Sequence, residues 1–317
     1  MRYAKIGGQA VLEGVMMRYG DEYAVAVRKP DGEIEIKKEK CMGLVSRFHM
    51  NKVPIVRGVL SFIDSLVLGM TTLTYSSSFY EDEDPGQTAD DREQPDEKTL
   101  KKQEQWESLM MAGTVVLSIA IAVVLFMLTP FFISSLLGKV ITSELAIAAL
   151  EGLFRILIFM GYMIAISQMK DIQRVFMYHG AEHKTIACIE HGMELTPENA
   201  ASCSRLHKRC GTSFLLIVMI VSIICFMFIR VDGLIMRLIV RILLIPVIAG
   251  VSYEIIQWAG RHDNALVDLV SAPGLMLQRL TTREPDASML EVAIASIEAI
   301  YDWRAFQAGE ERAACDK

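Results

Sequence analysis

Charged residues are scarce in this chain. They make up 22% of its 317 residues, whereas apolar residues make up 52%, and the mean hydropathy is +0.33. A soluble protein of this length carries more charge on its surface, so the composition excludes an ordinary soluble enzyme and indicates a membrane protein. The net charge of −6 has the wrong sign for a nucleic-acid-binding surface, so we expect no nucleic-acid partner.

Several short motifs are also missing. The six cysteines form no Cys-x-x-Cys pair, and most of them lie in segments that we place in the cytosol, so a disulfide framework is not expected. The stretch Met1–Lys40 lacks the apolar core that a cleavable secretory signal requires. The chain contains no Gly-Lys-Ser or Gly-Lys-Thr sequence, which excludes the phosphate-binding loop of P-loop proteins.

Apolar residues are gathered in four long runs. The runs cover residues 112–128, 145–166, 214–229 and 238–256, and each approaches the roughly 20 residues that a helix needs to cross a bilayer. We therefore expect a mainly α membrane protein with a bundle of four transmembrane helices within residues 108–260.

The distribution of Lys and Arg predicts how this bundle is oriented. Residues 168–213, between the second and third runs, are rich in both, whereas only Lys139 lies between the first two runs. The N-terminal region is also rich in Lys and Arg. By the positive-inside rule, we place both termini and the 168–213 segment in the cytoplasm, with the lipid bilayer as the first partner.

The segments before the bundle differ from one another in pattern. Residues 1–52 alternate apolar and polar side chains around a Lys29–Gly32 turn, which predicts a small β-rich cytoplasmic element. Residues 53–80 predict a helix with Arg57 and Asp64 inside it, which favours an amphipathic helix on the membrane surface over a fifth span. Residues 81–107 are acidic and interrupted by proline, which predicts a flexible linker.

The segment after the bundle, residues 261–317, is expected to contain cytoplasmic amphipathic helices. One should begin at Ala272–Gly274 and end near Arg283. Apolar residues at helical spacing within 288–303 predict another, with one face packed on a neighbouring element.

The most informative motif is His-x-x-Glu-His, formed by His179, Glu182 and His183. Residues four apart on a helix share a face, so the two imidazoles can bind one divalent ion. This order reverses the His-Glu-x-x-His motif of zinc proteases and is called inverzincin. It predicts Zn²⁺ as cofactor, His179 and His183 as ligands, and Glu182 as the catalytic base. The alternative is a cytosolic helix that carries these residues by chance.

A catalytic zinc ion takes three protein ligands and leaves one position for water. Candidates for the third ligand are His207 and Cys210, just before the third apolar run, Glu254, near the cytoplasmic end of the fourth, and Glu190 in the loop after the motif. Glu254 fits the inverzincin plan, and a carboxylate in a membrane helix is costly unless it has a function. The alternative for Glu254 is an ion pair with a cation such as Arg261. For His207 and Cys210 it is a packing role in a loop.

Longer blocks of sequence carry a family resemblance. The opening Gly7-Gly8-Gln9-Ala10-Val11, with Glu13-Gly14-Val15-Met16-Met17-Arg18, resembles the first motif of the YqhQ-like family of bacterial membrane proteins. Further matching blocks are Tyr178–Thr185, Arg209–Phe214, Ser252–Glu254 and Pro273–Pro285. The resemblance covers nearly the whole chain. It implies a multi-pass protein of the bacterial inner membrane, and a metal-dependent enzyme whose substrate is not indicated.

Two classes of function remain open. One is a membrane-embedded metal-dependent hydrolase, such as a peptidase, in which Lys184 or Arg209 would stabilise a developing oxyanion. The other is a non-enzymatic scaffold for a cytoplasmic protein, or a transporter, in which the cluster is a structural metal site or a polar network. The predicted spans carry few internal polar residues, which argues mildly against transport. The sequence does not indicate the oligomeric state or the role of the opening glycine-rich motif. The simplest interpretation of this motif is structural, as part of a small sheet over the cytoplasmic side of the bundle.

Overall fold

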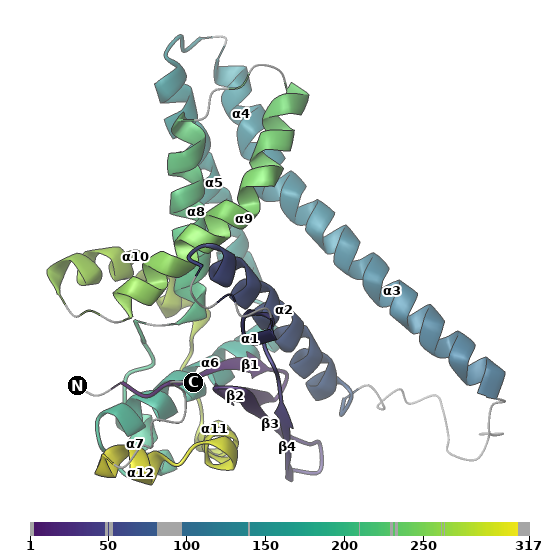
Figure 1. The fold of residues 1–317 in the computed structure, drawn as a ribbon, viewed down its shortest axis with the longest axis vertical. Helices are drawn as coiled ribbons and strands as arrows, with labels where there is room; N and C mark the ends of the chain where they lie inside the picture. Colours follow the sequence, from purple (N-terminus) through teal and green to yellow (C-terminus); the bar gives the residue numbers. More distant parts are fainter. Residues whose placement is uncertain are drawn as a thin grey trace. The chain divides into compact units, whose positions relative to one another are not determined.

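The computed structural model describes residues 3–47, 50, 53–80, 97–138, 140–208, 210–228, 231, 234–260, 262 and 264–309 (Figure 1). The chain forms two compact units. The larger consists of Met1–Tyr80, Met163–Cys225 and Arg230–Lys317, and the smaller of Glu81–Tyr162 and Phe226–Ile229. The candidate site lies within the larger unit.

Five helical segments of the described chain, rather than the four predicted, are long and apolar enough to cross a membrane. The predicted four-helix count is therefore not matched. The segments are Val56–Ser77, Ala112–Leu137, Glu144–Ile166, Gly211–Phe228 and Ile239–Ala259. The additional one is helix α2 (Val56–Ser77), whose 22 residues reach the necessary length and apolar content despite Arg57 and Asp64.

The smaller unit contains a continuous helical stretch and most of a second helix. Helix α3 (Glu97–Val123) passes through the π-helical turn η1 (Val124–Leu128) into α4 (Thr129–Leu137), and α5 (Glu144–Ile166) follows. Arg155 of α5 donates from Nη2 to Glu151 at 2.9 Å and from Nε to the carbonyl of Phe126 at 3.1 Å. The pair therefore neutralises both charges and satisfies a carbonyl group in the π-helical turn.

Helix α3 begins inside the segment predicted as a linker. Its first residue is Glu97, because the stretch that follows is rich in Glu, Lys, Gln and Leu, which favour helix. The rest of that predicted linker, residues 81–96, lies outside the described residues.

The N-terminal region forms a four-stranded antiparallel sheet in the order β1-β2-β3-β4, as its alternation predicts. The strands are β1 (Ile6–Val11), β2 (Gly14–Tyr19), β3 (Glu22–Arg28) and β4 (Ile34–Lys40). Successive side chains on a strand point to opposite faces, and both faces of this sheet are covered. Val11, Met16 and Val25 pack on the α2 side with Leu68, whereas Val15, Met17 and Ala24 belong to the other core.

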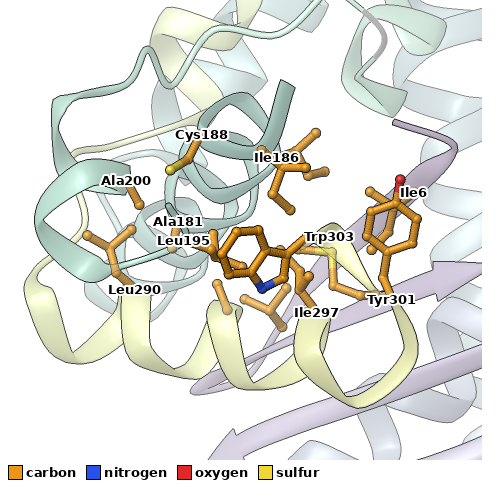
Figure 2. Close-up of a cluster of buried hydrophobic side chains, with 14 of the residues drawn as sticks. Ile6, Ala181, Ile186, Cys188, Leu195, Ala200, Leu290, Ile297, Tyr301 and Trp303 are labelled. Carbon is orange, nitrogen blue, oxygen red and sulfur yellow. The ribbon is translucent and has the colours of Figure 1, made fainter. Parts of the chain in front are cut away.

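That second core joins the sheet to two helices from distant parts of the sequence, α6 (Lys170–Glu190) and α11 (Ala287–Ile300). Figure 2 shows side chains of β1, α6 and α11 pointing into one cluster with Trp303 among them. The N-terminal and C-terminal regions of the chain are thus parts of one hydrophobic core, in which α11 packs on β2 and β3 and α6 packs on β1 and α11.

The remaining helices are α1 (Leu44–Arg47), α7 (Pro197–Ser202), α8 (Gly211–Phe228), α9 (Leu234–Ala259), α10 (Ala265–Thr281) and α12 (Trp303–Ala308). Helix α10 begins earlier than the predicted start at Ala272, because Asn264 caps it by accepting from the Val267 amide at 2.9 Å. Pro273 lies inside this helix instead of starting it. The predicted helix at 288–303 is confirmed as α11.

The chain after α10 crosses α6 at Gly180. The Arg283 amide donates to the carbonyl of Phe176 at 2.9 Å, and a Cβ on Gly180 would overlap the Arg283 carbonyl oxygen. A residue without a side chain is therefore required here, one position after His179, for the two segments to touch.

Replacing Gly180 by Ala should destabilise the protein by about 1–3 kcal/mol, because the added methyl group forces backbone apart. The matched control is Gly161→Ala on α5, where a Cβ meets nothing within 4 Å. Because Ala has a higher helix propensity than Gly, this substitution should be neutral or stabilise the protein by up to about 1 kcal/mol. Thermal unfolding of both variants in detergent tests this. Equal stability of the two variants would contradict the close crossing.

Candidate functional site

Helix α6 places the three residues of the His-x-x-Glu-His motif together. His179 and His183 lie one turn apart, and their ring centroids are 4.4 Å from each other. His183 and Glu182 are almost fully buried, at 2% and 6% exposed. Buried polar side chains need partners to offset the loss of water, and the partners of these three residues determine their chemistry.

Both imidazole rings are held by backbone carbonyl groups. Nδ1 of His179 lies 2.9 Å from the carbonyl oxygen of Thr281, and Nδ1 of His183 lies 2.6 Å from that of Arg205. A carbonyl oxygen only accepts, so Nδ1 of each ring carries the proton and Nε2 presents its lone pair. Burial lowers the pKa of His183, although Cys210 opposes this shift in part. The neutral form, which binds metals, is therefore favoured.

The thiol of Cys210 completes the cluster. Its Sγ lies 3.2 Å from Nε2 of His179, and the ligand atoms of His179, His183 and Cys210 all lie within 4.8 Å of one another. Cys210 directly precedes α8, and Thr212 contacts its sulfur through Oγ1 at 3.1 Å and through the amide at 3.4 Å. The sulfur is thus held at the start of α8, beside His179.

Glu182 points toward the N-terminal sheet. Its Oε1 accepts the amide of Gly8 in β1 at 3.1 Å. Burial raises the pKa of the Glu182 carboxyl, although the nearby His179 and His207 and the Gly8 amide oppose this shift. A carboxyl group with a raised pKa is a better proton acceptor, as general-base catalysis requires.

The cluster opens into a cavity of about 910 Å³. His179, Glu182 and Cys210 lie on its wall, and further lining residues come from β1, β2, α2 and α9. This volume is at the upper end of the range for small-molecule sites. Residues from five separate segments of the chain therefore meet around one space large enough for a substrate.

His207 and Glu190 lie near the cluster but interact with each other. Nε2 of His207 is 3.3 Å from Oε2 of Glu190, and Oε1 of the same carboxylate accepts the Ala4 amide at 2.9 Å. The His207 ring centroid is 5.8 Å from that of His183. His207, predicted as a possible third ligand, therefore lies beside the group formed by His179, His183 and Cys210 and is not one of its members.

The structure places Glu254 away from the histidines. Arg57 of α2 donates from Nε to Oε1 of Glu254 at 2.8 Å. Glu254 therefore forms an ion pair, as the alternative interpretation predicted, but its partner is Arg57. Glu254 lines a separate pocket with Ile55 and Trp258, whereas its neighbour Tyr253 lines the main cavity. Arg261 lies outside the described residues.

Lys184 does not face the cavity. Its ammonium group donates to the carbonyl oxygens of Ala201 and Cys203, each at 2.8 Å, and pairs with Glu284 at 3.0 Å. An ammonium group has three protons, so these acceptors leave none for an oxyanion. The other predicted oxyanion donor, Arg209, lies outside the described residues.

Several functional neighbours were not predicted from the sequence. Gln278 is fully buried and clamps the loop before Cys210, since it accepts the His207 amide and donates to the His207 carbonyl, both at 2.8 Å. Arg205 and Thr281 act through their main-chain carbonyl groups. Every residue has such a group, so the residue types in the sequence do not identify these two positions. For Gly8 the only signal is its place in the opening block of the family resemblance.

The comparisons with known proteins agree with that resemblance. A family model described as "Protein of unknown function (DUF1385)" matches residues 53–303. The chain belongs to this family. The "Uncharacterized protein YqhQ" of Bacillus subtilis (strain 168) is 38% identical over 291 residues, which cover 92% of this chain and 90% of that protein. No solved structure matches the chain. These descriptions name no activity, so the metal and the enzyme assignment stay predictions.

We expect N-ethylmaleimide to modify Cys210 before Cys188 in metal-free protein. Cys210 lies on the cavity wall, whereas burial in the core raises the pKa of Cys188 to about 12 and keeps it protonated at neutral pH. Added Zn²⁺ should slow the modification of Cys210 and leave Cys188 unchanged, as measured by peptide mass spectrometry. Equal protection of both thiols would contradict the cluster.

Proposed function

We propose that this protein is a membrane-bound, metal-dependent hydrolase whose ion is held by His179, His183 and Cys210. The observation that carries the proposal is the pair of carbonyl acceptors at the two Nδ1 atoms, which leaves Nε2 of each ring as the ligand atom beside one thiol. Metal-binding histidines commonly have such partners. Two imidazoles and a thiolate suit Zn²⁺ and leave one coordination position for water.

In this proposal Glu182 is the general base. A zinc ion would supply Lewis acidity and lower the pKa of its water ligand. The Glu182 carboxylate is held by the Gly8 amide on the cavity wall, and burial raises its proton affinity. It can therefore take a proton from a nucleophile in the cavity and return it to a leaving group.

A structural metal site is the second candidate. The cluster ties α6 to the start of α8 and, through Thr281, to the end of α10. An ion there would cross-link three segments, as in a membrane scaffold that presents a cytoplasmic surface. The role of Glu182 distinguishes the two candidates, because only the hydrolase needs its carboxylate.

The first test is the zinc content of protein purified in detergent. We expect near-stoichiometric zinc in the wild type and a loss of at least tenfold in zinc affinity for His183→Ala and Cys210→Ser, since each removes a ligand. His191→Ala, at the end of the same helix and outside the cluster, is the matched control and should keep its zinc. Glu254→Gln should also keep it, and loss of zinc there would restore Glu254 as the third ligand.

The second test uses Glu182→Gln. The variant should keep its zinc and lose its activity, read as complementation of a deletion strain at matched expression level. A base that contributes about 10²–10⁴-fold to the rate would leave too little turnover to complement. Full complementation by this variant would exclude the hydrolase and leave the structural site.

We also propose four membrane crossings, with the sheet and both termini in the cytoplasm of the bacterial cell. The sheet, α6 and α11 share one hydrophobic core, so an even number of crossings must separate each of them from the next. Helix α2 returns to the sheet at its end, since Leu12 donates its amide to Ser76 at 3.1 Å and the Tyr80 hydroxyl donates to the Arg28 carbonyl. It therefore crosses zero times, and the other four apolar segments cross once each.

Helix α2 is then best placed along the membrane surface. Its large apolar side chains that are exposed in the structure follow helical spacing on one side: Ile63, Leu66, Val67, Met70 and Leu73. Its polar residues Ser61, Asp64 and Ser65 line the cavity on another side. An apolar stripe opposite a polar face is the pattern of a helix that lies in the lipid interface.

Labelling of single cysteines in intact cells tests this topology. An impermeant maleimide should modify a cysteine at Ser143, between α4 and α5, and should not modify one at Glu198 in α7. The positive-inside rule places these two positions on opposite sides of the membrane. Permeabilised cells, in which both should react, provide the control. Modification of Glu198→Cys from outside would overturn the placement of the site.

A further inference from the structure

We propose that helix α10 lies in the surface of the lipid bilayer, and that its contact with lipid holds the loop before Cys210 in place. This contact is an interaction surface and takes no part in the chemistry, so the inference goes beyond the proposed hydrolase. From the proposed topology it uses one feature, namely that α8 and α9 cross the membrane.

The first step concerns the apolar side chains that α10 exposes. Leu266, Leu269 and Met276 are 56%, 69% and 71% exposed. Together with the half-buried Pro273 and Leu280, they recur at alternating spacings of three and four residues. Residues at these spacings share one side of a helix, so α10 presents a continuous apolar stripe along its whole length.

The other sides of α10 have a different character. Asp268 and Arg279 are exposed beside the stripe, and Asp268 pairs with Lys208 at 2.7 Å. The third side is buried against the protein and includes Gln278 and Thr281. An exposed apolar stripe next to a charged side is the pattern of a helix that lies in the lipid interface.

The second step concerns the level at which α10 lies. A Cβ on Gly274 would be 2.4 Å from Oγ of Ser213, and Gln278 donates from Nε2 to the same oxygen at 3.2 Å. Ser213 belongs to the first turn of α8, a segment long enough to cross a membrane. Helix α10 also follows soon after the end of α9, where Trp258 is 38% exposed, and tryptophan is enriched where spans meet the headgroups.

These contacts place α10 at the boundary of the bilayer, next to the start of one span and the end of another. The lipid around α8 and α9 is continuous with the surroundings of the stripe. The apolar side chains can therefore enter the boundary between headgroups and acyl chains without a protein partner. Lipid is the occupant that this position favours.

The third step concerns what the contact does for the candidate site. Gln278 accepts the His207 amide and donates to the His207 carbonyl, both at 2.8 Å, and the Thr281 carbonyl accepts from Nδ1 of His179. The side of α10 that faces the protein thus holds the loop before Cys210 and one histidine ring. A helix anchored in lipid along its other side keeps these acceptors at a fixed position relative to α6.

Site-specific photocrosslinking tests the contact with lipid. The photoreactive residue p-benzoylphenylalanine is introduced at Leu269 or Met276, in protein reconstituted into phosphatidylcholine and phosphatidylglycerol vesicles. We expect lipid adducts at both positions, fewer at Arg279 on the charged side of α10, and none at Ile36, which is 45% exposed on β4. Mass spectrometry identifies the adducts.

Two results would overturn the proposal. One is the absence of lipid adducts at both Leu269 and Met276, or equal amounts at Ile36. The other is a crosslink from these positions to a second copy of the chain, which would assign the stripe to a dimer interface.

Hydrogen exchange tests the link from lipid to the loop. Leu269→Glu combined with Met276→Glu should weaken the anchoring of α10 and speed amide exchange in residues 204–208 by roughly fivefold or more, the factor expected for one lost hydrogen bond. Ile36→Glu is the matched control and should leave this exchange unchanged. Unaltered exchange in α11 would show that the core stays folded. Equal exchange of residues 204–208 in the double variant and the wild type would contradict the link.

Both experiments use metal-free protein, so their outcome does not depend on the proposed function. Lipid adducts in a protein that binds no zinc would retain the membrane contact and reject the hydrolase. Zinc binding without lipid adducts at α10 would retain the metal site and reject the membrane contact.

Discussion

Two backbone carbonyl groups, those of Arg205 and Thr281, determine what the histidine pair of α6 can do. Each accepts from Nδ1 of one ring, at 2.6 Å for His183 and 2.9 Å for His179. The tautomer that results presents Nε2 as an electron-pair donor, and the ring orientation is held at the same time. Because one carbonyl lies in the loop between α7 and α8 and the other at the end of α10, the cluster exists only where these two distant segments pack on α6.

The N-terminal sheet depends on the same helix. Arg174, near the start of α6, pairs with Glu13 in the turn between β1 and β2, and Gly8 donates its amide to Glu182 two turns later. These two contacts align β1 along α6 and bring the opening motif to the cavity. A motif that reads as a simple structural sheet is therefore also part of the wall on which the proposed base lies.

Much of this arrangement follows from sequence patterns with a defined period. The spacing of His179 and His183 predicts one helix face, and the alternation before residue 40 predicts the sheet, because both depend on local backbone geometry. The third member of the cluster could not be chosen in this way. Cys210 and Glu254 were both consistent with the expected topology. The register of α9 turns Tyr253 toward the cavity and Glu254 toward Arg57, and only the packed structure contains that information.

Helix α2 shows why composition alone does not decide a membrane crossing. Its length and apolar content equal those of a span. Yet the sheet precedes it in the chain, and Ser76 near its end and Tyr80 after it contact the sheet region again. In the topology that we propose, this connectivity outweighs the hydropathy of α2. Asp64 is one of the charged residues that make α2 less suited to cross a bilayer. Its carboxylate accepts the Leu44 amide at 2.8 Å and lines the cavity. A buried carboxylate would be costly in lipid, whereas Asp64 here lines the same cavity as His179.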